Sequence, residues 1–162
     1  LQHLEIIDNK KENKAYNEDS NILINEIKGD ILYIDPPYNE RQYLPNYHVL
    51  ETISKYDNPN IYGKTGLRPY TEVKSKYCIK GKVLKEFSNL IKNANFKYII
   101  VSYSSEGLMS QEQIKEVLIE NGVKTTYNLK KIPYRRYKHT KGEVKHNLNE
   151  FIFFIAKREL WL

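Results

Sequence analysis

The sequence predicts an α/β fold, and three observations carry that prediction. The continuous apolar run 31–34 and the mainly apolar segment 98–103 are typical of strands buried in a parallel sheet. A helical pattern lies between them at 83–94, with apolar residues recurring on one face. Two more strand-like segments, 123–132 and 150–157, are separated by a polar stretch and predict a terminal antiparallel hairpin.

The remaining elements follow from local signals. A short strand is predicted at 14–17, and a helix at 45–56, where apolar residues recur three apart. The segment 57–82 is punctuated by Pro and Gly and is expected to be irregular; loops of that length are usually functional. Ser110 and Gln113 form a capping box for a further helix, which Gly122 ends. The resulting order is β-α-β-α-β-β, and we expect residues 1–162 to form a single domain.

Composition narrows the class of protein. The net charge of +6 favours a polyanionic partner. Cys78 is the only cysteine, which excludes a disulfide framework and favours a reducing cytoplasm. No apolar run approaches the roughly 20 residues of a membrane span, so no membrane association is predicted. The four histidines have no metal-ligand spacing with Cys78, so no metal site is predicted.

The most informative motif is Asp35-Pro36-Pro37-Tyr38, which directly follows the apolar run 31–34. Ligands of open α/β sheets bind at the carboxyl ends of the strands. Both prolines fix φ near −65°, so the turn is stiff. The Asp35 carboxylate and the Pro36 carbonyl can therefore point at one small polar group. The alternative is an ordinary turn that ends a strand.

This motif and its surroundings resemble the Dam-type adenine-specific DNA methyltransferases of restriction-modification systems. The resemblance is dense over 29–52, through Arg41-Gln42-Tyr43 and Asn46-Tyr47-His48, and extends thinly from about Ala15 to Lys157. It implies the C-terminal, catalytic half of a class I (Rossmann-like) methyltransferase sheet. The glycine-rich cofactor turn and the target-recognition region of that family are not found, so we expect both to be absent from this chain. A short independent protein of similar fold is the alternative.

The resemblance implies methyl transfer from S-adenosylmethionine to the amine of an adenine in double-stranded DNA. Asp35, Pro36, Pro37 and Tyr38 are then the catalytic residues. The Asp35 carboxylate and the Pro36 carbonyl would each accept one N–H of the amine, which frees its lone pair for attack. Tyr38 would stack on the base after it is flipped out of the duplex. The alternative for Tyr38 is a tyrosine of the core.

In the family, an acidic residue at the end of the preceding strand accepts a hydrogen bond from the cofactor's adenine. Asn17, Glu18 and Asp19 compete for this role, and Asp19 is favoured. Asp19 is also a good helix N-cap, and the two roles are compatible. The expected cofactor contacts are therefore Asp19, Asn17 and Asp35.

Two segments are expected to bind DNA. The loop after the motif would border the target pocket, with Arg41 suited to a phosphate and Gln42 to a base edge. The second segment is a basic, tyrosine-containing stretch at 130–145, suited to backbone contacts and base stacking. For both, the alternative is a solvated polar loop. The expected DNA contacts are Asn39, Arg41, Gln42, Tyr43, Arg135, Arg136, Tyr137 and Lys138.

The predicted function is thus site-specific DNA adenine N6-methylation. A cognate restriction endonuclease is a further expected partner. An RNA adenine methyltransferase and a DNA cytosine-N4 methyltransferase are alternatives, because both substrates offer a conjugated exocyclic amine. A non-catalytic nucleic-acid-binding domain on a methyltransferase-like scaffold is the alternative from another class.

Overall fold

The computed structural model describes residues 8–134 and 148–157. Within these residues one sheet has the strand order β1-β2-β4-β3. Strand β1 (Lys28–Ile34) runs parallel to β2 (Asn95–Ser104), whereas β4 (Leu148–Ala156) is antiparallel to both β2 and β3 (Asn128–Tyr134). The α/β prediction with a terminal antiparallel hairpin is therefore confirmed.

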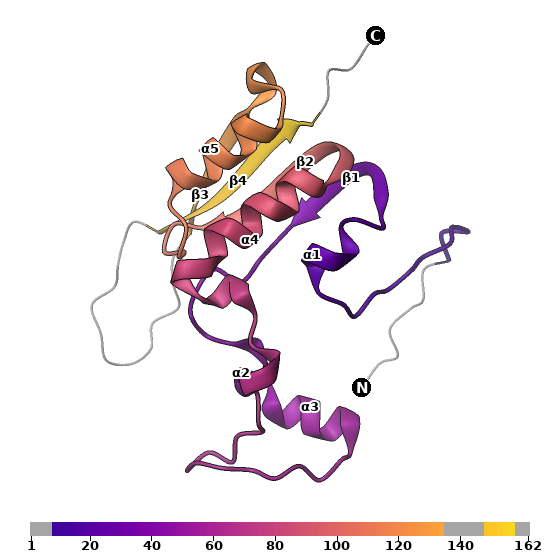
Figure 1. Cartoon of the computed structure of the whole chain (residues 1–162), viewed down its shortest axis with the longest axis vertical. Helices are drawn as coiled ribbons and strands as arrows, with labels where there is room; N and C mark the ends of the chain where they lie inside the picture. The colour runs from indigo at the N-terminus through magenta and orange to yellow at the C-terminus, as the bar shows by residue number, and fades with distance from the viewer. Residues whose placement is uncertain (1–7, 135–147, 158–162) are drawn as a thin grey trace.

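Two helices cover one face of this sheet. Helix α4 (Lys80–Asn93) and helix α5 (Gln111–Asn121) pack side by side in front of the strands (Figure 1). The core between them and the sheet includes Phe87, Ile91, Val101 and Phe153, each with 0% of its surface exposed. The capping box predicted for α5 is present, because the Ser110 side chain accepts from the Gln113 amide and the Gln113 side chain accepts in return.

The opposite face of the sheet is covered by no helix of the described residues (Figure 1). Alternation along β1 turns Ile31 and Tyr33 to this face, where they are 59% and 58% exposed. Ile152 and Phe154 of β4 point the same way and are half-buried. Parallel strands are normally buried on both sides. This face is therefore an apolar surface beside the outer edge of β1, which pairs with no other described strand.

The strand predicted at 14–17 is wrong. Residues 14–17 are exposed coil, and the chain first becomes regular in helix α1 (Ser20–Leu23). A strand persists only where a neighbour takes up its backbone hydrogen bonds. No described segment pairs with 14–17, and its apolar content is limited to Ala15 and Tyr16.

The helix predicted at 45–56 is two helices. Helix α2 (Tyr43–Asn46) and helix α3 (His48–Lys55) are separated at Tyr47, whose φ of −112° and ψ of 20° lie outside the helical region. The first helix begins two residues earlier than predicted. Pro45 is tolerated there because it stands in the first turn, where no intrahelical donor is required.

Short 3₁₀ helices occur in two segments where the sequence predicted an irregular loop or a strand. The segment expected to be irregular contains η1 (Thr71–Val73) and η2 (Lys76–Cys78). The segment 123–132 opens with η3 (Lys124–Thr126), so β3 begins only at Asn128. The Val123 amide donates to the Ala156 carbonyl at 2.8 Å, which ties this turn to the end of β4. Among the described residues, no helix has the length and apolar content needed to cross a bilayer.

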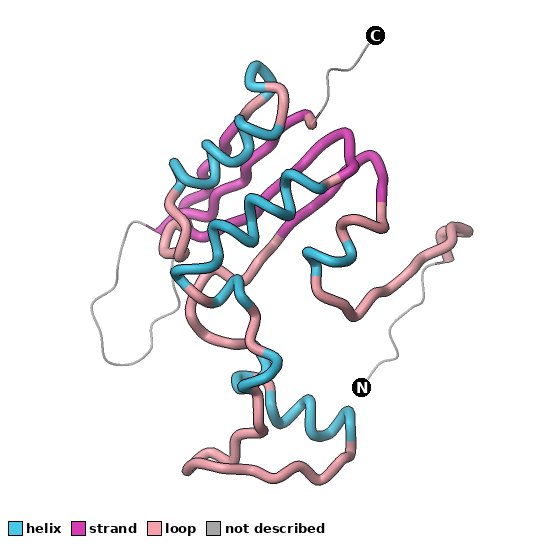
Figure 2. Tube along the Cα trace, viewed as in Figure 1, coloured by secondary structure: helices cyan, strands magenta, loops and turns pink. Residues whose placement is uncertain are grey.

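Helices α2 and α3, with the loop that follows, extend away from the sheet (Figures 1 and 2). The Arg68 guanidinium closes this extension, because it donates to both carboxylate oxygens of Asp57, at 2.7 and 2.6 Å. It also donates to the Thr52 hydroxyl at 3.2 Å. Arg68 is only 8% exposed, so this fork joins the end of α3 to the returning loop.

The hydrogen bonds from Arg68 lower the pKa of Asp57 below its usual value. A carboxylate with a depressed folded-state pKa stabilises the structure above its unfolded pKa of about 4, and that stabilisation is lost as the pH falls through the folded value. We therefore expect amide hydrogen exchange in the extension to accelerate as the pH falls from 5 toward 2, beyond the intrinsic pH dependence. In Asp57→Asn this extra acceleration should vanish; if it remains unchanged, another group is responsible.

Candidate active site

The four residues after β1 form an exposed corner at the edge of the sheet. Asp35 is exposed, Pro36 is buried and Pro37 is half-buried, so the prolines anchor the turn while the carboxylate faces solvent. The Tyr38 carbonyl accepts from the Leu108 amide at 2.8 Å. Because β1 and β2 are parallel, this bond joins the two loops that leave the carboxyl ends of neighbouring strands.

A cavity of about 910 Å³ lies against this corner. Four parts of the chain line it: residues within 17–27, the end of β1 with Asp35 to Pro37, residues 73–77, and Glu86 with Leu90 on α4. It therefore brings together Asn17, Asp19 and Asp35, which lie up to eighteen positions apart in the sequence. Its volume is within the range of about 300–1,000 Å³ that small-molecule sites occupy.

The acceptors of the corner are available. Within residues 8–134 and 148–157, no group donates a hydrogen bond to the Asp35 carboxylate or to the Pro36 carbonyl. A buried structural carboxylate would instead be paired. Asp35 and Pro36 thus present two adjacent acceptors beside the cavity.

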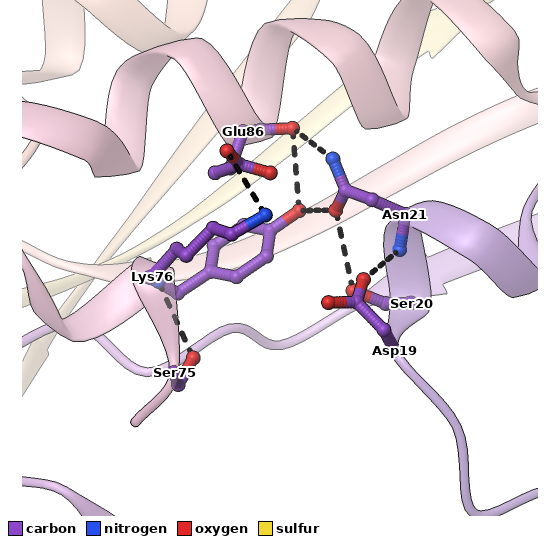
Figure 3. A network of polar contacts seen from close by, with 7 residues as sticks. Asp19, Ser20, Asn21, Ser75, Lys76 and Glu86 are labelled. Carbon is purple, nitrogen blue, oxygen red and sulfur yellow. Dashed lines mark hydrogen bonds and ion pairs between the residues drawn. The ribbon is translucent and has the colours of Figure 1, made fainter. Parts of the chain in front are cut away.

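Asp19 caps a helix and also lines the cavity. It is the N-cap of α1, and its Oδ1 accepts from the Asn21 amide at 2.8 Å. Among the described residues nothing donates to Oδ2, which points away from α1 in Figure 3. Capping therefore uses one carboxylate oxygen and leaves the other beside the cavity.

Three exposed tyrosines lie in the corner and in the segment that follows it. Tyr38, Tyr43 and Tyr47 are 39%, 56% and 54% exposed. Partial burial raises the pKa of the Tyr43 phenol, and the negative charge of Asp35 adds to that rise. The Tyr43 and Tyr47 rings stack with centroids 5.9 Å apart and planes at 10°. Tyr47 was not among the predicted site residues, although its spacing of four from Tyr43 could have indicated the pair.

The polar side chains after the corner are engaged within the chain. The Asn39 side chain accepts from the Arg41 amide at 2.9 Å, and the Arg41 side chain is exposed. Gln42 pairs with the backbone of Ser75: its Oε1 accepts from the Ser75 amide at 2.8 Å and its Nε2 donates to the Ser75 carbonyl at 3.2 Å. The predicted DNA-contact loop is therefore fastened to the 73–77 wall of the cavity. Reading a base edge would require Gln42 to release Ser75.

The second predicted DNA segment is only partly visible. Arg135, Arg136, Tyr137 and Lys138 lie outside the described residues. Lys130 is exposed on β3, and the Lys131 ammonium lies 5.6 Å from the centre of the Phe151 ring. Within the described ranges, no group of three or more His, Cys, Asp or Glu side chains is arranged to hold a metal ion.

The wall at 73–77 was missed at the sequence level. Tyr77 is 8% exposed, and its hydroxyl lies 2.7 Å from Oδ1 of Asn21. The neighbouring Lys76 ammonium pairs with Glu86 at 3.6 Å. No periodicity or motif marks this stretch, because its contacts are to residues far away in the sequence.

Comparison with known proteins agrees with this geometry. A family model described as D12 class N6 adenine-specific DNA methyltransferase matches residues 2–117. The chain is 55% identical over 157 residues to the type II methyltransferase M.FokI of Planomicrobium okeanokoites. It is 42% identical over 158 residues to the modification methylase StsI of Streptococcus sanguinis, and 47% identical over 148 residues to the type II methyltransferase M.NlaIII of Neisseria lactamica.

These alignments cover 97%, 98% and 89% of the chain. The chain nevertheless spans only 24% of M.FokI, 24% of StsI and 43% of M.NlaIII. No solved structure matches it.

Proposed function

The chain belongs to the D12 class N6 adenine-specific DNA methyltransferase family, and on that premise we propose that it supplies the catalytic corner of an S-adenosylmethionine-dependent enzyme that methylates adenine in double-stranded DNA. The observation that carries this proposal is the Asp35 carboxylate, which accepts no hydrogen bond from the described residues and lies just after β1 against the same cavity as Asp19. We further propose that the glycine-rich half of the cofactor site and the target-recognition region belong to other parts of a longer polypeptide. The small share of each relative that the chain spans supports this.

The cavity residues suit the cofactor. Apolar side chains on its walls, among them Ile24 and Leu32, can pack against an adenine ring, and Oδ2 of Asp19 can accept from the ring's amine. Asn17 offers a further polar contact, and the Asp35 carboxylate can face the positive charge of a sulfonium. When bound, S-adenosylmethionine supplies the methyl group. The bond from its sulfur to the methyl carbon breaks as the amine nitrogen attacks, and the cofactor is left as a neutral thioether.

The corner orients and activates the target amine. The lone pair of an adenine amine is delocalised into the ring, so the nitrogen is a weak nucleophile. When the Asp35 carboxylate and the Pro36 carbonyl each accept one N–H, a pyramidal nitrogen is favoured and its lone pair is localised. Fixed acceptors in a partly dehydrated site stabilise the positive charge that develops on the nitrogen as it is alkylated.

The target base must leave the duplex to reach this corner, at a cost of a few kcal/mol. Tyr38 is exposed beside Asp35 and can return about 1–3 kcal/mol of this by stacking on the base. Arg41 and Tyr43 on the following loop are proposed to contact the flanking DNA, as are Asn39, Gln42 and the basic stretch 135–138. We propose that the reaction takes place in the cytoplasm and that a cognate restriction endonuclease is the partner activity.

The decisive experiment identifies the methylated product. The full-length protein is incubated with isotopically methyl-labelled S-adenosylmethionine in two separate reactions, one with duplex DNA and one with RNA. The labelled nucleosides are then resolved by mass spectrometry. We expect N6-methyladenine in duplex DNA at one short sequence. Label in N4-methylcytosine, label confined to RNA, or no transfer to any of these would each overturn the proposal.

A further inference from the structure

A chain of hydrogen bonds runs from α4 to Asp19 through two residues that line or border the cavity (Figure 3). The Tyr77 hydroxyl donates to Oδ1 of Asn21 at 2.7 Å, and Nδ2 of Asn21 donates to the Glu86 carbonyl at 2.8 Å. The backbone amide of the same Asn21 donates to Oδ1 of Asp19. Asn21 thus bonds to α4, to the 73–77 wall and to the Asp19 carboxylate.

Asp19 depends on this link because its own helix is too short to hold it. Helix α1 has only four residues, and isolated helices of that length are unstable in water. The segment preceding it, 10–19, is exposed. The side-chain amide of Asn21 therefore anchors α1 to α4. The N-cap bond from the Asn21 backbone amide then holds the Asp19 carboxylate in place.

From this arrangement we propose that Tyr77 and Asn21 are positioning residues, which aim Oδ2 of Asp19 at the amine of the cofactor's adenine and so give the site its preference for adenosine. This inference rests on the proposed function, because it needs Asp19 as a cofactor contact. Neither residue touches the reacting atoms. Their role is to hold Oδ2 of Asp19 in one direction. Its hydrogen bond to the adenine amine then favours ligands that carry that amine over ligands that lack it.

The environment of the Tyr77 hydroxyl supports this role. Burial raises the pKa of Tyr77 to about 12. The phenol therefore stays protonated and remains a donor to Asn21 across the pH range in which the protein works. The hydroxyl also lies 3.4 Å from the Glu86 carbonyl, so the same short region of α4 orients both the phenol and the Asn21 amide.

The test compares two ligands in the full-length protein. Calorimetry measures the affinity for S-adenosylhomocysteine and for its purine analogue, in which hydrogen replaces the 6-amino group. Loss of a hydrogen bond to a charged acceptor corresponds to about tenfold or more in affinity, so the wild type should prefer the amine by at least that ratio. Tyr77→Phe, which removes only the hydroxyl, is expected to reduce the ratio to within about threefold.

Asp19→Ala and Tyr56→Phe complete the design. Asp19→Ala should abolish the preference, whereas Tyr56→Phe, at a residue 94% exposed, should leave it at the wild-type value. If Asp19→Ala keeps the full preference, the assignment of Asp19 in the proposed function fails. If Asp19→Ala loses the preference and Tyr77→Phe retains it, only the positioning inference fails.

A purely structural role for Tyr77 has a different signature. It would weaken both ligands by the same factor and leave the ratio unchanged, which overturns the inference. Asn21→Ala provides a second variant should Tyr77→Phe fold poorly, as judged by its circular dichroism. It removes the side-chain bonds of Asn21 to Tyr77, Glu86 and Ser20 and is expected to reduce the ratio as Tyr77→Phe does. An unchanged ratio in a folded Asn21→Ala protein contradicts the proposal.

Discussion

Replacement of Asp35 by alanine is expected to reduce methyl transfer by the full-length protein by about 100- to 1,000-fold, which is the usual effect of removing one preorganised group that stabilises developing charge. The loss should fall on kcat under saturating DNA and cofactor, because the acceptor acts most strongly as the nitrogen becomes positive. Asp35→Asn should fall between the wild type and Asp35→Ala, since its amide oxygen still accepts one N–H but carries no full charge. Single-turnover methylation of a labelled duplex measures the step directly.

Asp30→Ala is the matched control for that experiment. Asp30 lies on β1, the strand that precedes Asp35, and is also an exposed carboxylate, but it pairs with the Lys97 ammonium at 2.7 Å and does not line the cavity. We expect its single-turnover rate to match that of the wild type. If Asp35→Ala transfers methyl groups at a near-normal rate, the corner has no catalytic role.

Phe153→Ala is expected to lower the free energy of unfolding by about 3–5 kcal/mol, the usual cost of truncating a fully buried aromatic side chain. Phe153 has 0% of its surface exposed and lies opposite Val101 and Leu129 in the register of the sheet. Its ring also meets the edge of Phe151, with centroids 5.9 Å apart. Truncation therefore opens a cavity at the centre of the sheet beneath the helices. Urea unfolding of the full-length protein, followed by circular dichroism, measures the change.

Phe154→Ala is the control that shows whether the loss of stability depends on how deeply the phenylalanine is buried or only on the removal of an aromatic ring. Phe154 is the next residue of β4 but points to the opposite face, where it is half-buried and stacks on Tyr98 at 5.7 Å. Its truncation should cost clearly less than that of Phe153, because less apolar surface returns to water. Equal losses for the two variants would mean that both faces of β4 are equally buried in the full-length protein.

The regular part of the fold was predictable because its signals are local. The run 31–34 is continuously apolar, the segment 98–103 is mainly apolar, and both lie in strands of the sheet. Helix α5 was bounded by its own capping box and by Gly122. At Gly122 a side chain would also come within 2.8 Å of the Ala156 carbonyl, a contact that no sequence pattern reports.

The cavity wall could not be predicted for the opposite reason. Ser75 and Tyr77 are defined by partners 33 and 56 positions away, Gln42 and Asn21. Neither bond leaves a periodicity in the sequence. The strand expected before Asp19 failed for a related reason, since a strand requires a neighbour that local composition cannot supply. The motif Asp35–Tyr38 could be recognised from the sequence because its four residues are adjacent in the chain.

The unshielded side of the sheet has a practical consequence for biochemistry on this segment. The exposed apolar side chains of Ile31 and Tyr33 lie beside the outer edge of β1, where no described strand pairs with the backbone donors and acceptors. Such an edge favours strand addition by another molecule. Produced by itself, the segment should self-associate as its concentration rises, and charged replacements such as Tyr33→Lys should restore monodisperse behaviour in light scattering. Material for enzymology is therefore better prepared from the intact polypeptide than from this excised piece.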